Sequence, residues 1–218
     1  MNRFLAQSAE FLPILLMGVK LTILVTVGSL AVSTVLGLIW ALMRVSGIRA
    51  LAAISRTIIN IIRGIPIIVQ LFYIYFVLPD FGITLSALQA AIIGLGIAYS
   101  AYQAENFRAG IEAIDHGQVE AAQSIGMGWA LMMRRVILPQ AVRIVLPPYG
   151  NTMIMMLKDS SQASTITVAE LALQGKLIAS ATFQNSTVFT LVALLYLTMS
   201  IPLIIIVGWL EKRFGRKA

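Results

Sequence analysis

The sequence predicts an all-α integral membrane protein with five transmembrane helices. Its 218 residues are 59% hydrophobic and 11% charged, with a mean hydropathy of +0.89, whereas soluble domains average about 45–50% apolar and about 25% charged residues. A hydrocarbon core of about 30 Å takes roughly 20 apolar residues to cross. Stretches that meet this length run over residues 14–43, 51–78, 85–104, 137–157 and 187–210. We expect them to form a single domain over residues 1–218.

The first two stretches are longer than a perpendicular span requires, so we expect each to tilt or kink. Pro66 predicts a kink in the second stretch, because proline lacks an N–H donor and its ring clashes with the preceding turn. The apolar run that begins at Phe11 is too long for the core of a signal peptide and lacks a small-residue cleavage site. We therefore interpret it as a retained first helix.

The distribution of basic residues predicts the orientation, since lysine and arginine near span ends favour the cytoplasmic face. With the C-terminus inside and five spans, the N-terminus is outside, and ten basic residues fall on the inner side against four on the outer side. The inner set is Arg44, Arg49, Arg56, Arg108, Arg134, Arg135, Lys212, Arg213, Arg216 and Lys217. The outer set is Arg3, Lys20, Lys158 and Lys176. Arg63 and Arg143 fall within spans and do not enter the comparison.

Several kinds of site are excluded by composition. The chain has no cysteine and a single histidine, His116, so it offers no thiolate or histidine cluster for a metal and no disulfide. Its net charge of +7 comes from basic residues at the ends of apolar runs, where lipid headgroups and topology explain them without nucleic acid. We expect no catalytic residue, no metal and no cofactor bound by this chain.

A central segment over residues 117–136 differs from its apolar neighbours and falls on the cytoplasmic side. Asp115 or Gln118 can begin a short helix there, and Glu120 in its first turn is favoured by the positive end of the helix dipole. Gly126 and Gly128 then interrupt the helix. On this pattern alone, the segment is either a plain amphipathic surface helix or a knob for a cytosolic partner.

The residues of this segment and three other motifs resemble one transporter family. Glu120, Ala121, Ala122 and Gly126, followed by Ile137, Leu138 and Pro139, are similar to the EAA loop of ABC-importer permeases. The polar amino acid (His/Glu/Gln/Arg/opine) branch of that family is resembled by three motifs: RGIP with the following IIVQL (residues 63–71), ENFRAG (105–110) and LKDSS (157–161).

The resemblance implies a type I ABC importer permease fold in which the EAA loop, residues 117–136, carries a cytoplasmic coupling helix. It implies the membrane-spanning subunit of an ATP-driven importer of polar amino acids in the bacterial inner (cytoplasmic) membrane. Two such subunits, a second copy or a sister permease, would form the path. A periplasmic or extracellular solute-binding protein would deliver substrate, and cytosolic ATPases would dock on the EAA loops. The chain has no G-x4-GK[ST] phosphate loop, so ATP hydrolysis is expected on the partner and the chain itself is not an enzyme.

Ionisable residues in or near the spans are the candidates for the substrate path, because a charge at mid-helix costs about 2.5–3.5 kcal/mol by insertion scales. They are Arg63, Glu105, Lys158 and Asp159, with the hydroxyls of Ser160 and Ser161. Each has a structural alternative. Arg63 could pair with the carbonyls freed at Pro66, Glu105 could pair with Arg108, and Lys158 could pair with Asp159.

Two other function classes fit a chain of this composition. A stand-alone secondary transporter or channel would use intramembrane charges without an ATPase, but it has no need of an EAA loop. A membrane anchor or assembly protein would not retain charges in its spans at that energetic cost. Co-purification of a cytosolic ATPase separates the importer from both.

Overall fold

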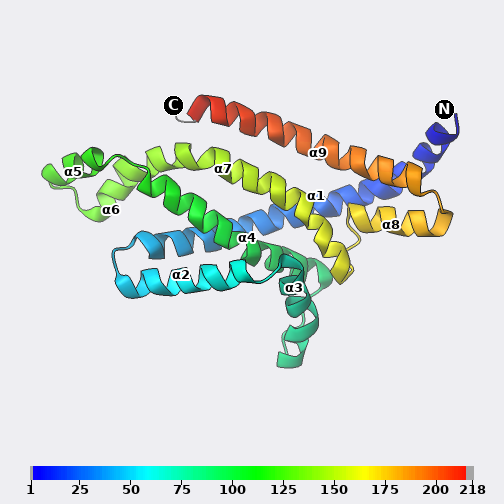
Figure 1. Cartoon of the computed structure of the whole chain (residues 1–218), viewed down its shortest axis with the longest axis horizontal. Helices are drawn as coiled ribbons and strands as arrows, with labels where there is room; N and C mark the ends of the chain where they lie inside the picture. The colour runs from blue at the N-terminus through cyan, green and yellow to red at the C-terminus, as the bar shows by residue number, and fades with distance from the viewer. Residues whose placement is uncertain (1, 215–218) are drawn as a thin grey trace.

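The computed structural model describes residues 2–214, which form a bundle of helices with no strand among them. The long axis of the bundle is set by α1 (Asn2–Val45), whose 44 residues extend about 66 Å at about 1.5 Å per residue. The N-terminus and α8 lie at one end of the bundle, and α5 and α6 lie at the other (Figure 1). A predicted all-α chain is therefore confirmed.

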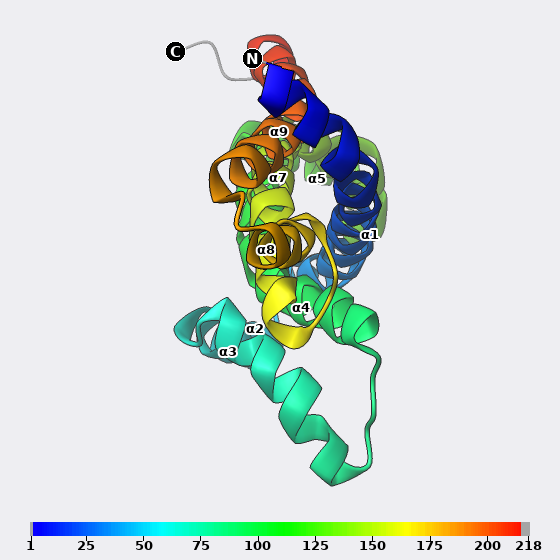
Figure 2. The same cartoon turned by 90° about the vertical axis from the view of Figure 1, so that its right-hand side faces the viewer.

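The second predicted stretch is broken where only a kink was expected. Residues 49–64 form α2 (Arg49–Gly64), and α3 (Ile67–Phe72) continues through a wide π turn (Tyr73–Val77) and a 3-10 turn (Leu78–Phe81). The two parts meet at 97°. Ile65 is extended at φ −108° because a residue before proline is disfavoured in the helical region, and Pro66 cannot donate across the break. The second part projects away from the bundle as a separate arm (Figure 2).

The centre of the bundle is α4 (Ala87–Glu112), which packs along α1 in the most extensive contact of the structure. A capping box begins α4: Ser86 accepts from the Gln89 backbone N–H, and the Gln89 side chain accepts from the Ser86 backbone N–H. Small residues let the two helices approach closely. A Cβ on Gly37 would lie 2.7 Å from the Cβ of Gln103.

After α4 the chain makes an excursion and returns to the bundle. The excursion contains α5 (His116–Ser124), α6 (Trp129–Met132) and a π turn (Met133–Ile137), and α7 (Leu138–Asp159) then leads back along α4. Pro139 lies in the first turn of α7, where its missing N–H is not needed, and a wide turn directly precedes it. A 3-10 turn (Ser160–Ile166) leads to α8 (Leu171–Thr182), and α9 (Asn185–Phe214) closes the chain.

In the part of the chain that the structure describes, two helices are both long and apolar enough to cross a membrane, namely α1 from residue 7 onward and α9. The bent pair 49–64 and 67–81 meets the same criteria if it is taken as one broken span. The helices α4 and α7 have 26 and 22 residues, which is enough length for a core of about 30 Å, but they are less apolar on average than α1 and α9. The arrangement as five spans remains a prediction.

Candidate functional site

A chain of contacts joins a cation on α2 to an anion at the end of α7. The guanidinium of Arg63 lies 5.7 Å from the centroid of the Tyr102 ring, and that ring lies 5.7 Å from the ring of Tyr99, centroid to centroid. The hydroxyl of Tyr99 donates a 2.7 Å hydrogen bond to Oδ2 of Asp159. Three elements therefore bring together two of the residues predicted from sequence, with two tyrosines of α4 between them.

The alternatives left open for these two residues are answered by the contacts. Arg63 does not take up the carbonyls freed at the break, because Nε2 of Gln70 donates to the carbonyls of Ile62 and Ile65 at 2.8 and 2.9 Å. Asp159 is hydrogen-bonded to Tyr99, and no ion pair joins it to Lys158 within residues 2–214. Arg63 and Asp159 therefore keep charges that no opposite charge in the described chain neutralises.

The other residues predicted near Asp159 play local roles. Lys158 is exposed. The hydroxyl of Ser160 donates to the Leu157 carbonyl at 2.7 Å, and the hydroxyl of Ser161 donates to the Lys158 carbonyl at 2.8 Å. Both hydroxyls thus stabilise the 3-10 turn that ends α7, and Ser160 is fully buried.

Glu105 lies between two arginines toward the C-terminal end of α4. Its Oε2 is 2.7 Å from Nη2 of Arg108, three residues along the helix, and its Oε1 is 3.4 Å from Nη1 of Arg44 on α1. Arg108 also pairs with Glu112. The predicted pairing with Arg108 is confirmed, and the carboxylate is held by two cations, which makes Glu105 a link between α1 and α4.

The excursion at residues 115–128 is built by two helix caps. Asp115 begins α5, with its Oδ1 accepting from the Gly117 N–H at 2.8 Å. At the other end, the N–H of Gly126 donates to the Gln123 carbonyl and that of Met127 donates to the Ala122 carbonyl, at 2.9 and 3.1 Å. This is a Schellman motif, which needs a left-handed residue at the position of Gly126. Gly126 has φ +77°, so its backbone conformation and not the space around it requires glycine there.

The EAA residues divide between a buried side and an exposed side. Ala122 and Ile137 are buried in a cluster with Met132, Met133 and Ala141, which holds the excursion against the start of α7. Glu120, Ala121, Leu138 and Pro139 are exposed. Ile125 and Trp129 are also exposed, by 73% and 54%. The loop therefore presents an apolar tip on a packed base.

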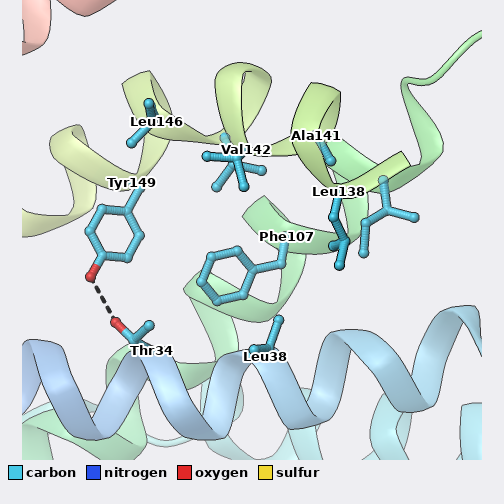
Figure 3. Close-up of a pocket in the computed structure, with 10 residues that line it drawn as sticks. Thr34, Leu38, Phe107, Leu138, Ala141, Val142, Leu146 and Tyr149 are labelled. Atoms are coloured by element: carbon cyan, nitrogen blue, oxygen red, sulfur yellow. Dashed lines mark hydrogen bonds between the residues drawn. The ribbon is translucent and has the colours of Figure 1, made fainter. Parts of the chain in front are cut away.

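An apolar cavity of about 360 Å³ lies between α1, α4 and α7 (Figure 3). Phe107 and Tyr149 stack across it with their ring centroids 6.2 Å apart, and Tyr149 shares a 2.7 Å hydrogen bond with Thr34. No charged side chain lines the cavity. A zwitterionic amino acid would find no partner for either charge there, so the cavity does not suit that substrate.

Glu170 is a buried carboxylate that joins α1, α8 and α9 at the end of the bundle away from α5 and α6 (Figure 1). It caps α8 by accepting from the N–H groups of Ala172 and Leu173 at 2.9 and 2.8 Å. The hydroxyl of Tyr196 on α9 donates to it at 2.8 Å, and Thr22 on α1 lies at 3.5 Å. Burial raises the pKa of the Glu170 carboxyl above its ordinary value, because burial disfavours the charged form, while these hydrogen bonds oppose the rise.

Residues 33–216 match the family described as binding-protein-dependent transport system inner membrane component. The chain belongs to this family. It is 41% identical over 195 residues to the probable glutamine ABC transporter permease protein GlnM of Bacillus subtilis (strain 168), covering 89% of this chain and 90% of that protein. It is 37% identical over 208 residues to the L-cystine transport system permease protein TcyB of the same organism, covering 95% of this chain and 89% of that protein.

A solved structure agrees with the sequence relatives. The crystal structure of an amino acid ABC transporter with histidines contains a chain that matches this permease with a TM-score of 0.88 at 38% identity. The match covers 96% of this chain and 98% of the other. The family predicted from the EAA loop and the three further motifs is thereby confirmed, and the stand-alone carrier or channel finds no support.

Sequence reasoning about this permease missed three residues that the geometry makes prominent. Tyr99 and Tyr102 carry the link between Arg63 and Asp159, and their spacing of three places them on one face of α4. That spacing was a usable signal. Glu170 gave a weaker one, since an acidic residue just before the apolar run of α8 is typical of a helix cap.

Proposed function

We propose that this chain is the membrane-spanning permease subunit of an ATP-driven importer of polar amino acids. The observation that carries the proposal is the family match over residues 33–216, joined to relatives named as amino-acid permeases that align over most of their length. The chain works in a pair with a second copy or a sister permease. A solute-binding protein delivers substrate on the outer side, and a separate cytosolic ATPase hydrolyses ATP.

The orientation follows from the basic residues. Five spans with the N-terminus outside place ten lysines and arginines on the cytoplasmic side against four outside. The excursion formed by α5 and α6 then faces the cytoplasm, at the end of the bundle opposite α8 (Figure 1). A C-terminal tag accessible from outside intact spheroplasts would contradict this orientation.

The excursion docks on the ATPase through its exposed tip. Ile125 and Trp129 supply apolar contact area, and Glu120 and Ala121 lie on the exposed side of α5. The base is fixed to α7 by the buried cluster around Ala122 and Ile137. Motion of the ATPase is therefore transmitted to α7 as rigid-body movement.

A substitution at Gly126 tests the docking. Gly126→Asp places a charge beside the apolar tip and disfavours the left-handed turn that holds it, so we expect loss of ATPase retention and of uptake with normal membrane abundance. Gly128→Asp is the matched control, because Gly128 has φ −66° and open space around it. The measurement is pull-down of the ATPase together with amino acid uptake into vesicles. Full retention and full uptake in the Gly126→Asp variant would refute the docking role.

Arg63 and Asp159 receive the two charged ends of the amino acid. A zwitterion needs a cation for its carboxylate and an acceptor for its ammonium, and these two side chains are the unneutralised charges joined through Tyr102 and Tyr99. Lys158, Ser160 and Ser161 adjoin Asp159 on the same part of the path. Glu105 lies farther along α4 toward the cytoplasm, where its ion pairs make it the floor of that path.

The charge at Asp159 is tested with a variant that keeps its size. Asp159→Asn retains an acceptor for the Tyr99 hydroxyl but cannot neutralise an ammonium group. We expect uptake to fall at least tenfold, which corresponds to about 1.4 kcal/mol, while Tyr99→Phe removes only the hydrogen bond and lowers uptake less. Unchanged rate and selectivity in a normally expressed Asp159→Asn variant would leave Asp159 with a structural role alone.

A further inference from the structure

The surface of α2 is divided into three faces. A buried face carries Ser55 and Ile59, and Ser55 donates a 2.8 Å hydrogen bond to the Trp40 carbonyl of α1. An exposed apolar flank carries Ile54 and Ile61, which are 50% and 58% exposed. The third face is a polar stripe, formed by Arg49, Arg56, Asn60 and Arg63, all of them exposed. At about 100° per residue these four fall within an arc of about 60°.

Lipid is a poor surrounding for the polar stripe. At about 1.5 Å per residue, Arg56, Asn60 and Arg63 lie about 10, 16 and 21 Å along the helix from Arg49. A long arginine near a helix end can reach back to the headgroups. Asn60 lies near the middle of a hydrocarbon core that is about 30 Å thick, and its side chain is too short to reach the headgroups. Each arginine left at mid-depth in lipid costs about 2.5–3.5 kcal/mol.

The arginines of the stripe also have no ion-pair partner within residues 2–214. The ion pairs in residues 2–214 join Arg44 to Glu105 and Arg108 to Glu105 and Glu112, and none involves an arginine of α2. The guanidinium of Arg63 lies 5.7 Å from the centroid of the Tyr102 ring, but this cation–π contact does not neutralise the charge of Arg63. Three cations on one helical face therefore depend on something outside this chain.

A dry contact with a second copy does not supply what they need. A two-fold contact brings the same surface patch from both subunits together. Arginines of the stripe would then face arginines, and buried like charges without counter-charges are strongly unfavourable. Water between the subunits removes the conflict, because it solvates the guanidinium groups and screens one stripe from the other.

We propose, on the basis of the proposed function, that the polar stripe of α2 lines a water-filled space shared with the second permease subunit. The stripe begins at Arg63, which Tyr102 and Tyr99 connect to Asp159, and runs to the cytoplasmic end of α2. Guanidinium groups bind carboxylates through two parallel hydrogen bonds. Arg56 therefore contacts the α-carboxylate of the amino acid after it leaves Arg63, and the stripe forms the exit half of the path.

The inference is tested by the water accessibility of adjacent positions on different faces. The chain has no cysteine, so single cysteines carry no background. In membranes that contain the whole transporter, we expect a charged, water-soluble thiol reagent to modify Asn60→Cys at least tenfold faster than Ile61→Cys. The two residues share one depth and are both exposed in the single chain. Equal rates at the two positions, whether fast or slow, would overturn the assignment of the hydrated face.

A second pair of cysteine variants controls for any loss of function that replacing Asn60 causes. Ala53 lies on the stripe face and Ile54 on the apolar flank, and both are exposed. Ala53→Cys is a small change in size, and we expect it to react faster than Ile54→Cys by the same margin. Equal rates in this pair contradict the hydrated face as directly as in the first.

The carboxylate contact has its own measurement. Arg56→Gln should lower the uptake rate at saturating amino acid about tenfold, and Arg56→Lys, which keeps the charge but not the two parallel hydrogen bonds, should lower it less. Equal rates for Arg56→Gln and the parent would overturn the contact. A parent transporter that imports no amino acid would instead refute the proposed function, and the cysteine rates would still report whether the stripe is hydrated.

Discussion

The helices α2 and α9 lie on opposite sides of the bundle and expose opposite chemistry (Figure 2). The exposed surface of α9 is apolar along its middle, with Leu194, Leu197, Ile201 and Ile205 each at least 42% exposed. Two exposed hydroxyls of α9 are satisfied within the helix: Thr190 donates to the Ser186 carbonyl at 2.7 Å and Thr198 donates to the Leu195 carbonyl at 2.8 Å. On α2 the exposed arginines have no such partner.

The difference shows that mean hydropathy alone does not tell what surrounds a membrane helix. Both helices belong to stretches that pass a test of apolar length, α2 together with the arm that follows it. What separates them is whether the exposed polar groups are satisfied by their own helix. A helix that satisfies them can face lipid, whereas one that does not needs water or a partner.

The largest expected effect comes from placing the same charge on each helix. Leu197→Arg puts an arginine near the middle of α9 on its lipid side, which costs about 2.5–3.5 kcal/mol of insertion free energy. Asn60→Arg adds one to the polar stripe and should insert normally. Membrane abundance and a glycosylation-based insertion assay measure the difference. Equal insertion of the two variants would contradict the proposed difference between α9, which faces lipid, and the polar stripe of α2, which faces water.

The next effect concerns the buried charge that ties α9 to its neighbours. Glu170→Ala removes the cap of α8 and leaves the Tyr196 hydroxyl unpaired, so we expect a loss of about 1–3 kcal/mol. Glu170→Gln keeps one acceptor oxygen, which serves only one of the two backbone N–H groups, and should lose less. Thermal unfolding of the purified complex in detergent gives the order. A Gln variant as unstable as the Ala variant would show that a single acceptor oxygen does not maintain the cap and that the full carboxylate is required.

A smaller effect is expected at the Arg63 end of the stripe. The contact between Arg63 and Tyr102 should contribute about 0.5–1 kcal/mol, since the ring is 41% exposed. Tyr102→Leu removes the aromatic face and Tyr102→Phe keeps it. A double-mutant cycle with Arg63→Gln, read from thermal unfolding, measures the coupling. A coupling as large for Phe as for Leu would mean that the hydroxyl is the group involved.

The smallest effect is expected at Arg49. Arg49 is the first residue of α2, so its side chain reaches the lipid headgroups whether this face of α2 is exposed to water or to lipid. Arg49→Gln should leave insertion, labelling of Asn60→Cys and uptake unchanged within error. A marked loss of uptake in this variant would extend the path to the very end of the helix.

The sequence was sufficient for the all-α class and the transporter family, because long apolar stretches and the EAA loop are local patterns. Residues such as Asp115 and Gly126 also act locally, through caps that their own neighbours complete. The Arg63–Tyr102–Tyr99–Asp159 chain could not be predicted, because it depends on how α2, α4 and α7 pack in space. Pro66 predicted a distortion of the second apolar stretch. Whether a proline bends a helix or ends it depends on which groups hydrogen-bond to the freed carbonyls.

Those carbonyls have a consequence for the corner between α2 and α3. A single amide, from Gln70, occupies the carbonyls of Ile62 and Ile65, so the corner holds its shape without solvent. Both bonds join the end of α2 to α3 and involve no other helix of the bundle. The 97° elbow can therefore serve as a fixed reference point while the parts around it move, and the arm beyond it turns with α2 as one piece.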